Sequence, residues 1–120
     1  MKTSLGIWAF GGMATRFNPG GYKPELANAS TVEKVRTAVE GLGELIDDYE
    51  FHYPQELSPA NLDEVRDALD GHGIYCVAAG THLDPRFGKG GLSSPDDATR
   101  AEALRLGLEA ADFAARRRGW

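Results

Sequence analysis

A chain of 120 residues, 42% of them hydrophobic and 26% charged, has the composition of one globular domain and excludes the low hydrophobicity of a disordered chain. Its formal net charge of −5 argues against a nucleic-acid partner, because binding a phosphate backbone needs a clustered basic surface. A single cysteine excludes an intrachain disulfide, and no apolar run reaches the roughly 20 residues of a membrane span. We therefore expect a cytoplasmic protein with no membrane partner.

The first predicted element is a strand over residues 5–10, because a short and continuous apolar run is typical of a strand buried on both faces. Residues 11–28 are rich in glycine and predict a long loop of the kind that often carries function. Ser30, with a glutamate three residues later, predicts a capping box. The helix that it starts should end near Gly43.

A second strand is predicted over residues 48–53, where aromatic residues alternate along the chain and a proline follows. Asn61 and Glu64 predict a second capping box and a second helix, which ends at a glycine-rich turn. The apolar run over residues 74–79 predicts a third strand, followed by another long glycine-rich loop.

The third predicted helix begins with Ser94 as its N-cap and Pro95 at its first position, and it runs to Gly119. Three strands that alternate with three helices predict right-handed crossovers and a parallel sheet. The loops after the strands should then meet at one edge of the sheet and form the functional face.

Three motifs lie in the predicted strands or directly after them. They are Leu5-Gly6-Ile7-Trp8, Glu50-Phe51-His52, and His82-Leu83-Asp84-Pro85-Arg86-Phe87 leading to a Gly-Gly-Leu-Ser-Ser run. In this order they resemble the start of the xylose isomerase family of sugar isomerases, and the resemblance covers nearly all of the chain. It implies an α/β fold of the parallel (β/α) TIM-barrel type, with residues 1–120 as the N-terminal portion. Since three strands cannot close an eight-stranded barrel, we expect a partial barrel with only its first three βα units.

The resemblance also implies a function, which is aldose–ketose isomerisation by a metal-assisted hydride shift. It implies that His52 is a catalytic residue that helps to open the sugar ring, and that Trp8, Phe17 and His82 bind the small-molecule sugar. The complete enzyme would use a divalent metal, Mg²⁺ or Mn²⁺. Because the family's metal ligands lie on later strands, we expect none to be bound by this chain alone. A homo-oligomer is expected.

One position departs from the family pattern. The family has an aspartate three residues after the histidine, where this chain has Gln55. A glutamine can hydrogen-bond an imidazole, but it does not stabilise the protonated ring as a carboxylate does. The departure makes another aldose or ketose at least as good a candidate substrate as xylose.

Two other functions stay open at this point. A non-catalytic α/β binding module, or a barrel fragment that regains a core by oligomerising, would need no metal ligands. A hydrolase or lyase of the same barrel superfamily, such as an endonuclease-like metal enzyme, is disfavoured by the acidic composition and the lack of a basic groove.

Overall fold

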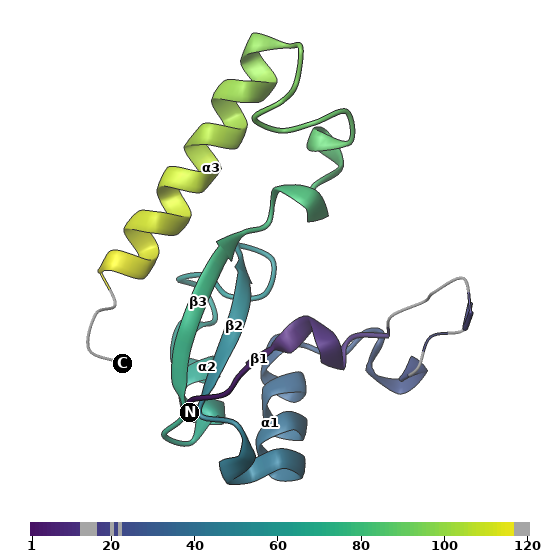
Figure 1. The fold of residues 1–120 in the computed structure, drawn as a ribbon, viewed down its shortest axis with the longest axis vertical. Helices are drawn as coiled ribbons and strands as arrows, with labels where there is room; N and C mark the ends of the chain where they lie inside the picture. The colour runs from purple at the N-terminus through teal and green to yellow at the C-terminus, as the bar shows by residue number, and fades with distance from the viewer. Residues whose placement is uncertain (13–16, 20, 22, 117–120) are drawn as a thin grey trace.

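The computed structural model describes residues 1–12, 17–19, 21 and 23–116. These residues form a parallel sheet with the strand order β1-β2-β3. The strands are β1 (Ser4–Gly6), β2 (Asp48–Tyr53) and β3 (Gly73–Ala79). The helices that alternate with them are α1 (Thr31–Leu42), α2 (Leu62–Leu69) and α3 (Asp97–Ala115) (Figure 1). The parallel pairing and the alternation of strands with helices confirm the sequence prediction.

The TIM-barrel arrangement expected from the sequence is wrong for this chain. In the described residues the sheet is open, and β1 and β3 are its two edges. A barrel closes only when about eight tilted strands pair all the way round. Three strands, each rotated by about 20–25° from the next, produce an open twisted sheet instead. The described part of the chain is therefore a small open α/β sheet.

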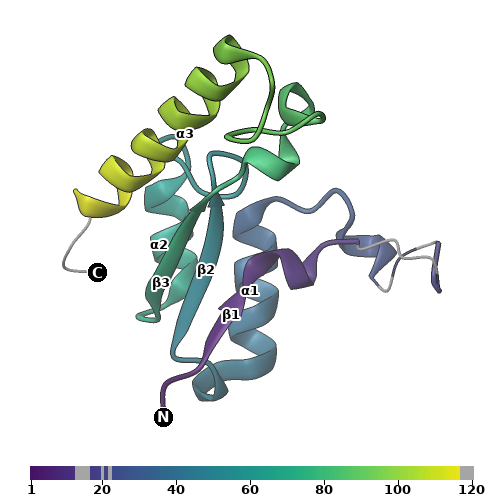
Figure 2. The same cartoon turned by 45° about the horizontal axis from the view of Figure 1, so that its top comes forward.

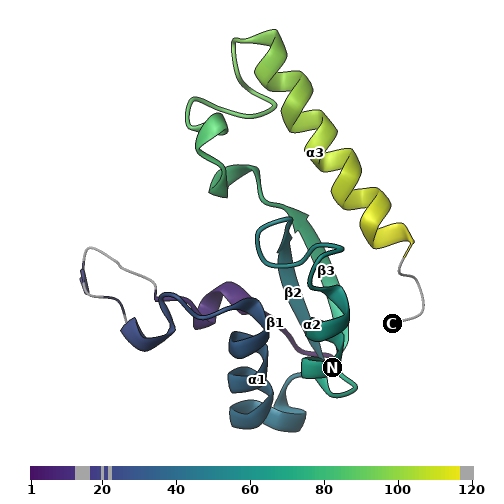
Figure 3. The same ribbon diagram turned by 180° about the vertical axis from the view of Figure 1, so that it is seen from behind.

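The core lies between β2 and the two helices α1 and α2, which share one face of the sheet (Figure 3). Tyr49 and Phe51 on β2 have no exposed surface and pack in one cluster with Val35 of α1 and Val65 of α2. Because side chains alternate along a strand, His52 points to the opposite face of the sheet.

The first strand is shorter than predicted. β1 ends at Gly6, and the second part of the predicted 5–10 strand is a turn of 3₁₀ helix, η1 (Ile7–Phe10). Trp8 folds back over the end of β1, so that a Cβ placed on Gly6 would lie 2.2 Å from the indole. A side chain at position 6 would exclude Trp8 from this place. The glycine therefore allows the position of the indole.

The predicted capping box of α1 is confirmed. The Ser30 amide donates to Glu33 Oε2 at 2.7 Å, and the Glu33 amide donates to Ser30 Oγ at 3.2 Å. The box predicted for α2 is wrong, because the Asn61 side chain makes no cap bond. Its amide instead donates to the Glu56 carbonyl at 2.9 Å and its Oδ1 accepts from the Ser58 amide at 2.9 Å. Asn61 therefore holds the turn between β2 and α2.

Helix α3 begins two residues later than predicted. Its N-cap is Asp96, whose carboxylate accepts from the Thr99 amide at 2.7 Å, whereas Ser94 is buried before the helix. The predicted end at Gly119 lies outside the described residues. None of the helices in the described part of the chain has the length and apolar character that crossing a membrane requires.

Candidate functional site

Three rings meet at the carboxyl ends of the three strands. His52 lies on β2, Trp8 lies in η1 directly after β1, and His82 lies in η4 (Thr81–Leu83) directly after β3. The ring centroids of Trp8 and His52 are 4.4 Å apart, and those of His52 and His82 are 4.7 Å apart. Because β2 is the middle strand, His52 lies between the other two rings. Figure 2 shows that the segments after β1 and β3 leave the sheet at the same end as the carboxyl end of β2.

The three rings differ in exposure. His52 is buried, with 9% of its surface exposed, whereas Trp8 is 36% exposed and His82 is also exposed. The cluster therefore consists of one buried imidazole, that of His52, and two solvent-accessible rings beside it, those of Trp8 and His82. An indole offers an apolar face for stacking, while imidazoles offer hydrogen bonds to hydroxyl groups.

A carboxylate orients the buried imidazole. Glu56 Oε2 lies 3.0 Å from His52 Nδ1 and also accepts from the His52 amide at 2.7 Å. A neutral imidazole that donates Nδ1–H to a carboxylate oxygen has Nε2 as its acceptor nitrogen. Nε2 makes no hydrogen bond within the described part of the chain. The pair has the arrangement of a proton-transfer dyad, an imidazole held by a carboxylate.

The position of Glu56 is set by the turn after β2. The Glu56 amide donates to the His52 carbonyl at 2.9 Å, and the Glu56 carbonyl accepts from Asn61 at 2.9 Å. These bonds on both sides of the residue hold its carboxylate against the His52 ring. Sequence reasoning missed Glu56, although its spacing of four residues from His52 brings it within reach once the chain reverses.

Gln55 does not take the place that the family pattern suggested. Its side-chain amide donates to the Gly80 carbonyl at 3.1 Å, which ties the turn after β2 to the end of β3. The carboxylate that seemed to be missing at position 55 is supplied by Glu56. The concern that His52 lacks a carboxylate partner is therefore removed.

Phe17 is the fourth residue that the sequence suggested for the site. It is 78% exposed, and the ring contacts that join Trp8, His52 and His82 do not include it. The structure thus brings together three of the four predicted residues.

The sheet face below His52 is polar. Glu50 is two residues before His52, so the two side chains share this face. Ser4 Oγ donates to the Glu50 carboxylate, and Cys76 is the register partner of Glu50 on β3. Burial, followed by the charge of Glu50, raises the pKa of the Cys76 thiol. A raised pKa keeps the sulfur protonated, so Cys76 is a poor nucleophile.

The described residues do not fit the metal site implied by the resemblance. Within residues 1–12, 17–19, 21 and 23–116, no three His, Cys, Asp or Glu side chains gather in a way that could hold a metal ion.

Comparison with known proteins leaves the family open. No protein-family model matches this chain, and no curated protein matches it. The likeness to xylose isomerases thus rests on the three quoted motifs. Apart from these motifs, the main feature of the structure that points to a function is the cluster of the Trp8, His52 and His82 rings with the Glu56 carboxylate.

Proposed function

We propose that this chain binds an aldose or a ketose at the Trp8, His52 and His82 cluster and opens the sugar ring, as one step of an aldose–ketose isomerisation. The observation that carries the proposal is the buried His52–Glu56 pair, with Nδ1 and Oε2 3.0 Å apart, between two accessible rings. It combines a group that transfers protons with surfaces that suit a sugar.

Ring opening needs two proton movements. The anomeric hydroxyl loses a proton, and the ring oxygen gains one. The bond between the ring oxygen and the anomeric carbon breaks while a C=O double bond forms between that carbon and the former hydroxyl oxygen. His52 Nε2 accepts the first proton, because Nδ1–H is donated to Glu56. The Glu56 carboxylate stabilises the resulting imidazolium, which then returns the proton to the ring oxygen. The step leaves His52 and Glu56 as they began.

The two accessible rings bind the sugar on either side of His52. Trp8 presents an indole that can stack on the apolar C–H face of a pyranose, and it is 36% exposed for this contact. His82 offers ring nitrogens to a hydroxyl on the other side, with its ring 4.7 Å from that of His52. Polar contact at His82 favours a hydroxyl-rich ligand over an apolar one.

The test measures sugar binding and ring opening separately. Binding is followed by Trp8 fluorescence in a Trp120→Phe background, in which Trp8 is the only indole, with D-xylose and D-glucose as probes. We expect saturable quenching with a Kd on the order of millimolar. Ring opening is followed by polarimetry as the mutarotation of the freshly dissolved α-anomer of each sugar.

Variants separate the two roles. We expect His52→Gln to lower the mutarotation rate about 100-fold, as loss of an acid–base group does, while binding persists. The matched control is His72→Gln, because His72 packs against Tyr49 rather than in the cluster. Binding without mutarotation would identify a non-catalytic sugar-binding module. Neither binding nor mutarotation would reject the whole proposal.

The proposed setting is the cytoplasm, and the proposed partner is a small sugar rather than a nucleic acid or a membrane. The single cysteine and the net charge of −5 support this setting and this choice of partner.

A further inference from the structure

Helix α3 has two apolar stripes on opposite sides. The inner stripe is buried against the rest of the molecule and consists of Ala103, Leu106, Ala110 and Phe113. The outer stripe is exposed and consists of Ala101, Leu104, Leu108, Ala111 and Ala115. Corresponding members of the two stripes are two residues apart, which is about 200° around a helix. The outer stripe is thus separate from the surface that joins α3 to the sheet.

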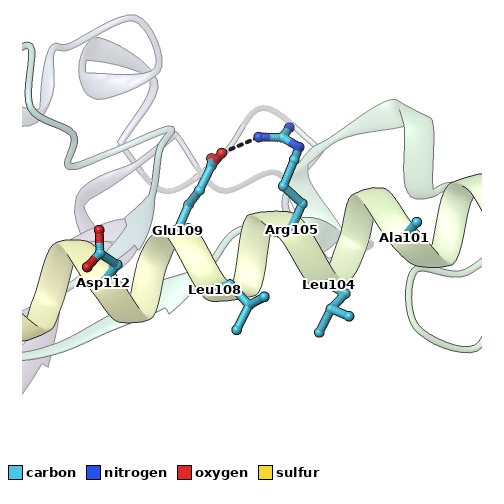
Figure 4. Close-up of a pocket in the computed structure, with 6 residues that line it drawn as sticks. All are labelled: Ala101, Leu104, Arg105, Leu108, Glu109 and Asp112. Atoms are coloured by element: carbon cyan, nitrogen blue, oxygen red, sulfur yellow. Dashed lines mark hydrogen bonds and ion pairs between the residues drawn. The ribbon is translucent and has the colours of Figure 1, made fainter.

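The outer stripe has the spacing of a helix-pairing surface. Its residues follow each other in alternating steps of three and four, which is the heptad pattern by which two helices interlock. Leu104 is 54% exposed and Leu108 is 62% exposed. Figure 4 shows both leucines pointing to the same side of the helix. Two large exposed leucines one turn apart form an apolar patch that a partner helix would cover.

The charges beside the stripe indicate which partner covers it. Arg105 and Asp112 lie on the same edge of the stripe, seven residues apart, and both line the groove along α3 (Figure 4). Within α3, Arg105 pairs with Glu102 and Glu109, and Asp112 pairs with Arg116. These ion pairs are solvent-exposed and therefore weak, so both charges can also engage a second copy. If a second copy of the helix lies antiparallel, with a two-fold axis beside Leu108, Arg105 of each copy faces Asp112 of the other. The opposite edge carries Gly107 and Ala114, so no like charges meet there.

We propose that the outer stripe of α3 is a homodimer interface, at which two copies of this chain pair α3 against α3 antiparallel. In this register the two Leu108 side chains meet near the axis, and each Leu104 packs against the small Ala111 of the other copy. Large residues facing small ones let helices approach to about 8–10 Å. The two Arg105–Asp112 contacts are attractive, so they favour this register over one in which Arg105 of one copy would face Arg105 of the other. The proposal is independent of the sugar site.

The first test is sedimentation equilibrium of the full chain over a wide range of concentrations. A single pair of helices is a small interface, so we expect a reversible dimer with a Kd on the order of tens of micromolar. Leu108→Glu brings two carboxylates together at the axis, and we expect it to weaken the dimer at least 100-fold. Because Leu108 is 62% exposed, helix content by circular dichroism should stay unchanged. Leu92→Glu, at a residue 68% exposed outside α3, is the matched control and should dimerise normally.

A charge exchange tests the register. Asp112→Arg should weaken the dimer about tenfold, because two arginines then face each other. The double variant Arg105→Asp/Asp112→Arg should restore the Kd to within about threefold of the wild type. Within one helix these residues are two turns apart and do not touch, so recovery reports a contact between copies. A wild-type chain that is monomeric at every concentration overturns the proposal, as does a dimer that Leu108→Glu leaves intact.

Discussion

At the scale of single residues, the candidate site depends on a carboxylate that sequence spacing alone did not reveal. The motif comparison drew attention to Gln55, yet that side chain bonds the Gly80 carbonyl, and Glu56 lies against His52. The turn after β2 decides which of two adjacent residues reaches the ring. Glu56 is therefore assigned as a positioning residue for His52 in the proposed ring opening.

Glu56→Gln tests this assignment. The glutamine keeps the shape of the side chain but removes the negative charge that stabilises the imidazolium. We expect mutarotation to slow about 10- to 100-fold, with the sugar Kd by Trp8 fluorescence unchanged within about threefold. Gln55→Ala is the neighbouring control, and it should leave the rate near that of the wild type. Equal rates for wild type and Glu56→Gln would mean that Glu56 has no part in proton transfer.

At the scale of elements, exposed carboxylates form hydrogen bonds at the N-terminal ends of α1 and α3. Glu33 completes the capping box of α1 by accepting from the Ser30 amide, and Asp96 caps α3 by accepting from both the amide and the hydroxyl of Thr99 at 2.7 Å. Hydrogen bonds with Thr99 lower the pKa of Asp96 from its ordinary value of 3.8. A lowered pKa in the folded state means that the carboxylate adds stability above about pH 4 and loses that contribution as the pH falls further.

Asp96→Ala should therefore lower the Tm by a few degrees at pH 7, because the Thr99 amide loses its acceptor. Asp96→Asn keeps an acceptor but does not titrate. We expect the Tm of the wild type to exceed that of Asp96→Asn above about pH 4 and the two to converge near pH 2, as measured by circular dichroism melts. A constant difference across that range would show that the charge of Asp96 does not stabilise the cap.

At the scale of the whole molecule, α3 is joined to the sheet through a few large side chains. Phe113 is 6% exposed and belongs to the main core, with its ring centroid 5.3 Å from that of Tyr53. Tyr53 also packs against a second cluster, made of Phe87, Ala103 and Leu106. Tyr53 therefore links the sheet core to the segment that leads into α3, which extends beyond the end of the sheet in Figure 1.

Phe113→Ala should lower the free energy of unfolding by about 3 kcal/mol, through lost burial and the cavity left between α3 and the sheet. Urea denaturation followed by circular dichroism measures the loss. The matched control is Leu45→Ala, which removes a side chain that is 72% exposed and should change stability by less than about 0.5 kcal/mol. A loss for Phe113→Ala as small as that of the control would contradict the packing of α3 on the core.

Features that depend on neighbours in the chain were predictable from the sequence alone. The bounds of β2 follow from its alternating aromatic residues and Pro54, and the α1 capping box follows from Ser30 and Glu33. Such signals act within a few residues, so no knowledge of the rest of the molecule is needed. The same holds for placing His52 at the end of β2 and His82 in the loop after β3.

The features decided only by tertiary structure depend on contacts through space. The fold of Trp8 over Gly6 shortens β1, and the turn after β2 brings Glu56 to His52. The pairing of three strands gives a small open sheet where a partial TIM barrel was expected. Strand closure and side-chain reach depend on twist and turn geometry, which no local run of residues specifies.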